Sequence, residues 1–569
     1  MPTGVGRESV PLGIVRDPVS VVRTKELLAA GTRCSLCIRS LAGQPARRQD
    51  FDAVVSWSWP RRLPGSKPVA AFDPRRPVKR RSLEGTVLAV GVLLRVYLAL
   101  VNTEANDDHL TVIRIIAQQH RLPRLRDAWE GFQPKLYHVP VAGLWNLSPW
   151  QSPSVQLRIA QLVACAAGIA TLFVVRRALI RRGLSPPIRV LAFTLVALNP
   201  ALIGLNAQAT NDSFVILFAT VALSEGCEFF RTGARRAFIV MSASVVLAVL
   251  SKGNGLVVFL AVTATLVHAI LGRQAVPGLS RRQLLGHSAV FVAVVLVCTA
   301  ALGSYRPNWE DTGNPFAING DRAPWPHLIE RTYVYRPGTT SIADTYLTFR
   351  FVDMLEHPTI TNDAVVYPLH RTSLWSQLYG RAHFSHFAQH PPSWRNTSPL
   401  VVTVGRLIFV LALLPTAFLL AGMMRAVFVL MVSGRRHASG DGAKLDEELL
   451  TLAAVGYIAF IIVYSLLYRD FSTMKAEFLF PALLAYVFFF ADEADRAEAR
   501  WAQRPQRRQV ARWVVALLIG LYVTDVVILA VQLTRRPPSP SAAATVRTQP
   551  VASLASAPPS GVRARDHGR

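Results

Sequence analysis

The sequence is poor in acidic residues and cysteine, and it has no nucleotide-binding fingerprint. Asp and Glu number 35 against 62 Lys and Arg, which leaves a formal net charge of +27. No GxGxxG or GxxxxGK[ST] run opens a helix after a strand, so a nucleotide-binding domain is not indicated. In a soluble protein the basic excess would suggest nucleic-acid binding. Here the arginines gather at the ends of apolar runs and in the N-terminal leader, so we attribute them to membrane orientation and predict no nucleic-acid partner.

The five cysteines do not indicate a disulfide framework or a metal site. Cys165, Cys227 and Cys298 stand inside apolar runs, where a free cysteine behaves as a small core residue. Cys34 and Cys37 form one CxxC pair in the leader, and a zinc site would need two further ligands nearby. We therefore predict neither a zinc site nor structural disulfides.

Long apolar runs dominate the chain, in which 51% of the residues are hydrophobic. A run of roughly 17–25 apolar residues is long enough to cross a bilayer as a helix. In lipid the backbone must satisfy its own hydrogen bonds, which favours spanning helices. The sequence therefore predicts an all-α polytopic membrane protein with about 11 transmembrane helices. The predicted spans lie at about 85–101, 154–175, 188–206, 213–230, 236–251, 254–272, 286–304, 399–424, 448–467, 474–491 and 513–533.

Basic clusters at the ends of these runs predict the topology. They fall on one side if the N-terminus is inside, and the positive-inside rule assigns that side to the cytoplasm. Outside then lie a first loop, 102–153, a large loop, 305–398, and a short link, 468–475. We predict a multi-pass protein of the inner (plasma) membrane whose active site faces the periplasm or the cell exterior. The clusters are Lys79-Arg80-Arg81, Arg176-Arg177 with Arg181-Arg182, Arg231 with Arg235-Arg236, Arg281-Arg282, Arg435-Arg436 and Arg507-Arg508.

The two ends of the sequence differ from the rest in composition. Residues 1–84 are rich in Arg, Pro, Ser and Gly, without an early apolar stretch typical of a signal peptide. We expect a disordered, basic cytoplasmic leader, and a working protein that begins near Arg80 is the alternative. A transmembrane module is predicted over 85–304 and C-terminal helices over 399–533, with the large loop between them. The tail, 534–569, is expected to be disordered.

Two adjacent carboxylates, Asp107 and Asp108, follow the first apolar run. A carboxylate within hydrogen-bond reach can take the proton of an attacking hydroxyl, and adjacent like charges raise the pKa of one member of such a pair. The spacing of Leu110, Ile113 and Ala117 indicates an amphipathic helix on the membrane surface, where a lipid-borne substrate would lie. We predict a general base here, although two solvated loop acids fit the spacing equally well.

The run Gln133-Pro134-Lys135-Leu136-Tyr137-His138 leads from the first loop towards the second span. Pro134 fixes the local backbone. Lys135 can meet a phosphate as a point charge. A lysine that snorkels at a helix end is an equally good interpretation of Lys135.

Two polar links separate later spans. Asn211 and Asp212 open the fourth span, where Asp212 suits a helix start, and binding of sugar or acceptor is the alternative. The link Ser251-Lys252-Gly253-Asn254-Gly255 joins two short runs, so it is predicted to lie in a cavity below the outer surface. A lysine at that depth is a functional candidate.

Arg469 and Lys475 are basic residues on the side that the positive-inside rule leaves poor in them. A polyprenyl phosphate head group would explain this breach, because phosphate favours Arg and Lys partners. Arg95, well inside the first span, is expected to snorkel to the interface instead.

The large loop contains His383, His386 and His390, which can share one helix face. Metal ligation by these histidines is the weaker alternative, because no carboxylate of suitable spacing is near. Neighbouring aromatic residues, Tyr379 among them, favour a packed surface or a platform for a sugar.

The order of these features resembles the GT-C class of membrane glycosyltransferases. The nearest likeness is to the bacterial branch related to protein O-mannosyltransferases (glycosyltransferase family 39) and to aminoarabinose transferases of lipid A. Members begin with one span, then an outer loop with an acidic pair, a juxtamembrane helix and a QPPLYY-like run. The resemblance covers about 85–533, and two positions depart from it, Lys135 in place of a usual Pro and Glu477 in place of a common basic residue. The matching segments are Asp107-Asp108, Leu122-Pro123, 129–138, Asn211-Asp212, Ser251-Lys252-Gly253 and 474–481.

This resemblance implies a GT-C fold and a polyprenyl-phosphate-linked sugar as donor, with a lipid, glycan or protein acceptor. It implies a single displacement with inversion, in which Asp107 or Asp108 takes the acceptor proton. No nucleotide or organic cofactor is expected, and some enzymes of the class use a divalent metal while others do not. The implied donor-phosphate ligands are Lys135, Lys252, Arg469 and Lys475. The implied substrate-binding residues are His109, Glu130, Gln133, Tyr137, Asn211, Asp212, Tyr379 and His383.

Two other functions compete with this interpretation. A transporter or flippase of lipid-linked sugars would have paired halves with polar residues at mid-membrane, and the sequence shows no convincing internal repeat. A non-catalytic scaffold with the same fold would not need the acidic pair in the first loop.

Overall fold

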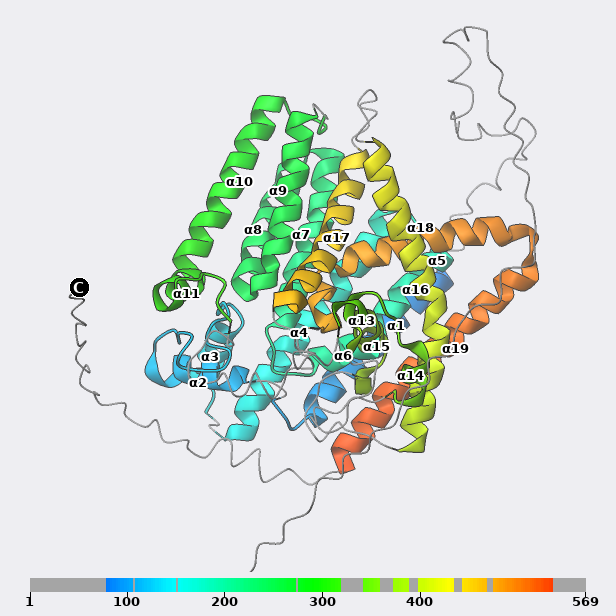
Figure 1. The fold of residues 1–569 in the computed structure, drawn as a ribbon, viewed down its shortest axis with the longest axis horizontal. Coiled ribbons are helices and arrows are strands. Elements are labelled where there is room, and N and C mark those ends of the chain that lie inside the picture. The colour runs from blue at the N-terminus through cyan, green and yellow to red at the C-terminus, as the bar shows by residue number, and fades with distance from the viewer. Residues whose placement is uncertain are drawn as a thin grey trace, which may run out of the picture. The chain divides into compact units, whose positions relative to one another are not determined.

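The computed structural model describes residues 78–105, 108–149, 152–272, 275–318, 341–358, 372–387, 398–433, 443–467 and 474–535. The chain divides into two compact units, Met1–Asp73 and Pro74–Arg569, and every described residue belongs to the second. The described residues form helices joined by turns, with no strand among them (Figure 1). Most of the predicted leader and the predicted tail beyond Arg535 lie outside the described residues.

The α-helices vary in length from a single turn to 35 residues. In chain order they are α1 (Val78–Val101), α2 (His109–Gln119), α3 (His138–Leu147), α4 (Pro153–Arg181), α5 (Pro186–Ala197), α6 (Pro200–Asn206), α7 (Asp212–Thr232), α8 (Arg235–Ser251), α9 (Leu256–Leu271), α10 (Arg281–Leu302), α11 (Tyr305–Thr312), α13 (Ile342–Tyr346), α14 (Phe351–Glu356), α15 (Leu374–His383), α16 (Pro399–Ser433), α17 (Ala443–Leu467), α18 (Leu483–Arg500) and α19 (Pro505–Arg535). Short 3-10 turns are η1 (Gly253–Gly255), η4 (Ser385–Phe387), η7 (Ala476–Phe478), η8 (Phe480–Ala482) and η9 (Trp501–Gln503).

Eight of the described helices are long and apolar enough to cross a membrane, and α5 with α6 makes a ninth that is bent by 47°. The all-α polytopic fold is therefore confirmed, but the predicted number of about 11 spans is not reached. Helix α8 has 17 residues, which rise only about 25 Å against a hydrocarbon core of about 30 Å. Helix α18 carries Asp492, Glu493 and Asp495 in its second half, so it lacks a continuous apolar surface.

The bend between α5 and α6 is held by Arg95 of α1. Pro200 has no N–H to continue the helix, so the carbonyls at the end of α5 need other donors. Arg95 Nη1 donates to the Ala197 oxygen at 2.6 Å, and Arg95 Nε donates to Asn206 Oδ1 at 2.9 Å. The side chain is only 1% exposed, so the expectation that Arg95 snorkels is wrong. From inside the first span, Arg95 supplies hydrogen-bond donors that the broken helix lacks.

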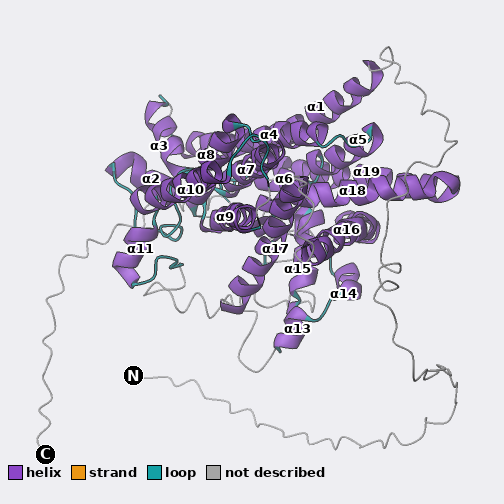
Figure 2. Cartoon of the chain, turned by 90° about the horizontal axis from the view of Figure 1, so that it is seen from above, coloured by secondary structure: helices purple, strands orange, loops and turns teal. Residues whose placement is uncertain are grey.

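The helices of the main bundle alternate in direction, so their links collect at two ends. At one end, which we call the loop end, α1, α6, α8 and α10 finish and α4, α7 and α9 begin. Asn102 beyond α1 donates to the Ala207 oxygen beyond α6 at 2.9 Å, and the Leu136 N–H donates to the Leu250 oxygen at 3.1 Å. Figure 1 shows α2, α3 and α11 near one another at this end, and Figure 2 shows the same three helices on one side of the bundle. The first loop therefore folds over the links between helices that the sequence predicted to lie on the same side of the membrane as this loop.

The opposite end, which we call the arginine end, contains the described arginine clusters. Here α4 and α7 finish and α17 begins, and Arg182 and Arg231 both contact Asp446. Arg189 at the start of α5 contacts Glu84 near the start of α1, at 2.7 Å. These contacts agree with the alternation that the arginine positions predicted. A large hydrophobic core between the two ends is built from α4–α10, α17 and α18.

Candidate functional site

A buried ion pair between Asp212 and Lys252 forms the centre of the loop end. Lys252 Nζ lies 2.7 Å from Asp212 Oδ1, and the two side chains are 11% and 7% exposed. Thr210 donates its hydroxyl to the other oxygen of Asp212 at 2.9 Å, and Lys252 Nζ lies 5.0 Å from the centre of the Phe478 ring. Taking two charges out of water is costly, so such a pair needs these additional partners.

The local sequence explains how Lys252 reaches Asp212. Helix α8 ends at Ser251, and Lys252 has an extended backbone with φ −158° and ψ 149°. The chain then turns at once through η1 into α9. At Gly255 a Cβ atom would lie 2.3 Å from the Ala248 oxygen, so the tight turn requires glycine there. The run Lys-Gly-Asn-Gly is thus a helix break that points a lysine at the start of α7.

Two asparagines beside this pair carry buried atoms without a hydrogen-bond partner among the described residues. Asn211 donates its amide to the Ser251 oxygen at 3.0 Å, but its Oδ1 accepts no hydrogen bond. Both the Nδ2 and the Oδ1 of Asn254, in η1, are also without a partner. A buried polar group without a partner costs about 1–3 kcal/mol. Such groups are rare in folded proteins, and they are expected where a ligand supplies the missing partner.

A pair of histidines from the first loop stands next to this group. His109 Nδ1 and His138 Nε2 are 3.0 Å apart, and both side chains are buried. Burial lowers the pKa of His138 well below its usual value, and the nearby charges of His109 and Lys135 act in the same direction. His109 is also close enough to Asp212 for their charges to interact. His109 therefore couples the first loop electrostatically to the Asp212–Lys252 pair.

Asp108 is engaged within the first loop itself. Thr111 donates its hydroxyl to Asp108 Oδ1 at 2.5 Å, and the Trp129 N–H donates to Oδ2 at 3.3 Å. Asp108 therefore ties the start of α2 to the segment that carries the QPKLYH run. Its neighbour Asp107 lies outside the described residues.

Lys135 is enclosed by oxygen atoms of the protein. Its Nζ donates to the Gly131 oxygen at 2.8 Å, to Ser304 Oγ at 3.2 Å and to the Gln133 oxygen. Burial lowers the pKa of Lys135 to about 7, against the opposing influence of Glu130 and Asp127. The ammonium thus joins the first loop to the junction of α10 and α11.

The remaining residues predicted in the first loop pack beside Lys135. Glu130 and Gln133 are buried, and the Gln133 oxygen also accepts from Ser304 Oγ at 2.8 Å. Tyr137 is fully buried and donates its hydroxyl to the Ala160 oxygen of α4 at 2.9 Å, and burial raises the pKa of Tyr137. These three residues hold the loop on the bundle.

Lys475 reaches the same neighbourhood from the C-terminal half of the chain. It precedes η7, the turn whose Phe478 lies under Lys252. Lys475 Nζ is 3.3 Å from Glu477 Oε1, and both side chains are about one-fifth exposed, at 18% and 21%. Arg469, the other predicted phosphate ligand of this link, lies outside the described residues.

Tyr379 and His383 of α15 face a different direction. Tyr379 donates to the Phe409 oxygen of α16. His383 contacts Tyr522 of α19 at 2.5 Å and Thr416 of α16 at 3.0 Å. Burial lowers the pKa of His383 to about 4. The structure thus places both residues among helices and not beside the Asp212–Lys252 pair.

The histidines of the large loop do not form a common cluster within the described residues. His386 Nδ1 lies 2.5 Å from Asp525 Oδ1 of α19, with both side chains buried, and His390 is outside the described residues. In the described part of the chain, Asp353, Glu356 and His357 place ligand atoms within 4.8 Å of one another. Glu356 and His357 are exposed, and exposed acidic groups commonly occur without a metal. We therefore assign this group no role.

Three contributors to the site, Asn254, His138 and Phe478, were not predicted from the sequence. Asn254 and His138 belong to runs that the sequence singled out, but only the structure shows that Asn254 is buried two residues after Lys252 and that His138 contacts His109. Phe478 lies in η7, within the segment 474–481 that carried part of the resemblance but was not assigned a role. The structure brings together Asp212, Lys252, Asn211 and His109, with Lys475 in the adjoining link.

Comparisons with known proteins found similarity in solved structures only. No protein-family profile matches the chain, and no curated protein matches its sequence. The chain is similar to the oligosaccharyltransferase of Archaeoglobus fulgidus in its apo form, with a TM-score of 0.42 and 14% identity over 79% of this chain and 56% of that one. It is similar to ArnT from Cupriavidus metallidurans in the apo state, with a TM-score of 0.32 and 17% identity over 82% of this chain and 91% of that one.

These similarities concern the fold. Further structures that the chain resembles are the archaeal enzyme, AglB, with an inhibitory peptide and a dolichol-phosphate, and ArnT bound to undecaprenyl phosphate. The chain spans only 56% of the length of the archaeal enzyme. At these identities and TM-scores, no residue of either protein assigns a role to a residue of this chain.

Proposed function

We propose that this chain is an integral membrane glycosyltransferase that moves a sugar from a polyprenyl-phosphate donor to an acceptor hydroxyl or amine at the loop end. The observation that carries the proposal is the buried Asp212–Lys252 pair together with asparagine atoms of Asn211 and Asn254 that have no partner among the described residues. Unpartnered buried polar atoms are rare in folded proteins, and a ligand that supplies the missing partners is one reason to keep them beside an ion pair. This one lies among donors and acceptors suited to a phosphorylated, hydroxyl-rich ligand.

Lys252 is the proposed primary ligand of the donor phosphate. An ammonium has three N–H donors, and Asp212 accepts one of them in the ion pair. A phosphate arriving at the other donors gains charge-assisted hydrogen bonds, while Asp212 holds the lysine side chain in place. Lys475 and Arg469, on the link 468–475 that precedes Phe478, are proposed to add positive charge where the leaving phosphate develops negative charge. Lys135 is fully occupied by protein oxygens, so we give it a positioning role instead.

The asparagines are the proposed ligands of the sugar. Asn211 Oδ1 accepts hydrogen bonds, and the amide of Asn254 both donates and accepts. Sugar hydroxyls do the same, so one sugar ring can satisfy all three atoms. A site built to hydrogen-bond a hydroxyl discriminates strongly against a ligand that lacks it. The same atoms would therefore contribute to donor selectivity.

The proposed reaction is a single displacement with inversion at the anomeric carbon. The acceptor oxygen or nitrogen bonds to that carbon while the bond from the carbon to the phosphate oxygen breaks, and the electron pair leaves with the phosphate. Asp107 takes the acceptor proton. Asp108 already accepts hydrogen bonds from Thr111 and Trp129, so it positions the loop that carries Asp107.

We place the loop end on the periplasmic or outer side of the inner membrane. The described arginine clusters lie at the opposite end, which the positive-inside rule assigns to the cytoplasm. A donor carried by a polyprenyl chain reaches such a site from within the bilayer. This arrangement needs no nucleotide at the site.

A donor screen tests the proposal directly. Membranes with and without the protein are incubated with an extract of polyprenyl-phosphate sugars, and the lipids are analysed by mass spectrometry. We expect one donor to be consumed and polyprenyl phosphate to accumulate, with loss of at least about a hundredfold in rate for Lys252→Gln. Arg512→Gln, at the arginine end, serves as the matched control and should keep the full rate. Passage of intact donor across sealed vesicles without transfer would show a transporter instead.

A further inference from the structure

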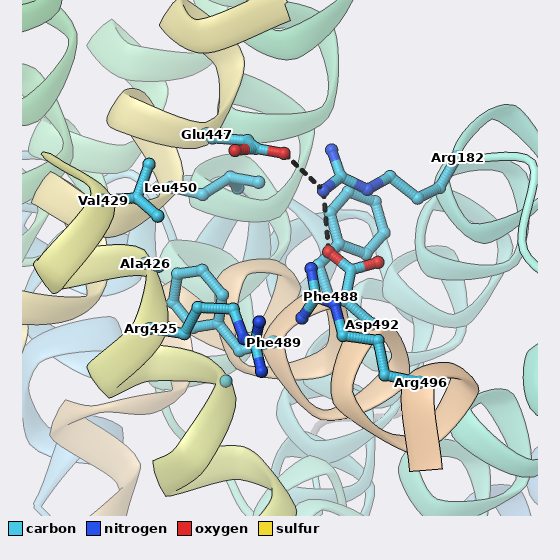
Figure 3. Close-up of a pocket in the computed structure, with 11 residues that line it drawn as sticks. Arg182, Arg425, Ala426, Val429, Glu447, Leu450, Phe488, Phe489, Asp492 and Arg496 are labelled. Atoms are coloured by element: carbon cyan, nitrogen blue, oxygen red, sulfur yellow. Dashed lines mark hydrogen bonds and ion pairs between the residues drawn. The ribbon is translucent and has the colours of Figure 1, made fainter. Parts of the chain in front are cut away.

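A pocket at the arginine end is formed by α16, α17 and α18 together with Arg182, which follows α4 (Figure 3). Its apolar wall includes Val429, Leu450 and Phe489. Helix α16 approaches α18 very closely there, because a Cβ atom at Gly422 would lie 2.2 Å from the Phe489 oxygen. The pocket therefore has an apolar interior built by close helix packing, with charged side chains around it.

The acidic side chains that line this pocket are paired with Arg182, which leaves the other lining arginines without an acidic partner from the lining. Arg182 binds Asp492 at 2.7 Å and Glu447 at 3.3 Å, which pairs the two acids that line the pocket. Its guanidinium also stacks 5.3 Å from the centre of the Phe488 ring. Figure 3 shows these contacts on the Arg182 side of the pocket. No acid of the lining is left to neutralise the other two arginines.

Those two arginines, Arg425 and Arg496, share a single carboxylate with a third. Glu493 lies 3.2 Å from Arg425, 3.2 Å from Arg496 and 2.5 Å from Arg500. One negative charge thus meets three positive charges. The surplus positive charge lies on α16 and α18, where Arg425 and Arg496 line the pocket.

The pocket opens beside a surface of large apolar side chains. On α16, Met424 is 64% exposed and Phe428 is 62% exposed. Arg425 lies between them in the sequence, and its side chain is 46% exposed. Exposed apolar side chains of this size on a membrane helix face lipid tails. A guanidinium among them is placed where a lipid head group meets the hydrocarbon.

We propose that Arg425 and Arg496 bind the phosphate of an anionic phospholipid whose acyl chains lie along α16. Guanidinium groups bind phosphate oxygens with two parallel hydrogen bonds, which suits two arginines at the mouth of an apolar pocket. Basic pockets between membrane helices on the cytoplasmic side are where anionic head groups are recognised. This site is at the opposite end of the bundle from the candidate active site and does not depend on the proposed activity.

Lipid-dependent thermal unfolding of the detergent-purified full chain tests the site. Phosphatidylglycerol should raise the unfolding temperature above that measured with phosphatidylcholine. We expect Arg425→Gln with Arg496→Gln to reduce affinity for phosphatidylglycerol roughly thirtyfold, at about fivefold for each arginine. Arg500 still neutralises Glu493 in this variant, so the fold does not lose the partner of a buried carboxylate.

The matched control is Arg508→Gln with Arg512→Gln. These two arginines share Glu498 outside the pocket, so the control removes the same charge and should keep the effect of phosphatidylglycerol. The proposal is overturned if both double variants respond equally to phosphatidylglycerol. It is also overturned if inorganic phosphate alone gives the same rise, or if phosphatidylcholine does. The ratio of phosphatidylglycerol to phosphatidylcholine that co-purifies gives a second readout and should fall only in the pocket variant.

Discussion

The two ends of the bundle both bury ion pairs, but they surround them differently. At the arginine end, Glu84 contacts Arg176 and Arg189, Asp446 contacts Arg182 and Arg231, and Glu493 contacts three arginines. At the loop end, Asp212 pairs with Lys252, and the neighbouring Asn211 and Asn254 have buried atoms that find no partner in the described part of the chain. The comparison teaches that burial of a charge does not identify a functional site. The loop end differs in the unpartnered asparagine amides beside its pair, whereas at the arginine end the Arg176 Nε atom that makes no hydrogen bond still lies 3.3 Å from the Glu84 carboxylate.

The physical reason is the cost of an unpaired buried group. Removing one partner of a buried pair costs about 3–5 kcal/mol, because the remaining charge has no other partner. A carboxylate held by several guanidiniums is protected against that loss. At the loop end the unpartnered amide atoms are expected to cost stability, which a ligand that supplies the missing hydrogen bonds would restore.

The largest expected effect comes from breaking the loop-end pair. Lys252→Gln should reduce donor turnover by at least about a hundredfold, because the leaving phosphate loses its main cation. It should also lower stability by about 3–5 kcal/mol, because Asp212 stays buried without its counter-charge. Turnover by lipid mass spectrometry and unfolding by thermal scan measure the two effects separately.

The double variant Asp212→Asn with Lys252→Gln separates stability from activity. It removes both charges, so most of the lost stability should return while turnover stays low. Recovery of turnover together with stability would show that the pair is structural, like those at the arginine end.

A change at the arginine end should affect stability alone. Glu493→Gln removes the carboxylate that three arginines share. The arginines are partly exposed to solvent, so we expect a loss of only about 1–2 kcal/mol, with unchanged turnover per folded molecule. Unfolding in denaturant gives the loss, and active-site-normalised turnover tests the second part. A tenfold loss of turnover in folded protein would contradict the contrast between the ends.

Asn254→Ala tests the unsatisfied groups directly. Ordinary loss of a buried amide destabilises a protein, but this amide has no partner among the described residues. We therefore expect equal or higher stability, by up to about 1 kcal/mol, and a turnover roughly tenfold lower. The matched variant Asn308→Ala removes an amide that donates to the Phe132 oxygen, and it should lose stability. Equal losses of stability in the two variants would remove the evidence for a ligand at Asn254.

The smallest effect concerns pH and Lys135. Burial lowers the pKa of Lys135 in the folded protein from 10.5 to about 7, so between these values the unfolded chain binds more protons than the folded one. Stability should therefore rise with pH above about 7, by at most about 1.4 kcal/mol per pH unit from this group. Lys135→Met should flatten that part of the stability profile relative to the native protein. Parallel profiles from pH 7 to 9 would show that Lys135 does not titrate there.

The sequence predicted which links meet, because arginine positions and apolar run lengths fix the direction of each helix. The first loop, Asp212, Lys252 and the link around Lys475 do lie at one end. The helix break at Ser251-Lys252-Gly253 was also predictable, because glycine ends helices and a short run cannot span. These are local properties of the chain, and the pattern of arginines, apolar runs and glycines is enough to predict them.

The partners of individual side chains were not predictable. Arg95 was expected to reach the interface. Instead, Pro200, about a hundred residues later, breaks the helix after α5, and the Ala197 carbonyl accepts a hydrogen bond that keeps the Arg95 side chain buried. Lys135 was assigned to phosphate, and its enclosure depends on Ser304, far along the chain. Such pairings follow from three-dimensional packing between distant segments. Asp107 and Arg469, which lie outside the described residues, stay predictions.

Binding of polyprenyl phosphate without its sugar tests the central claim most directly. The ligand is titrated into the native protein, the Asp212→Asn with Lys252→Gln variant and the Arg508→Gln with Arg512→Gln control, and occupancy is measured by native mass spectrometry. The loop-end pair predicts binding to the native protein and to the control, and at least about a tenfold loss of affinity in the loop-end variant. Equal affinity in all three proteins would contradict the assignment of the donor phosphate to Lys252.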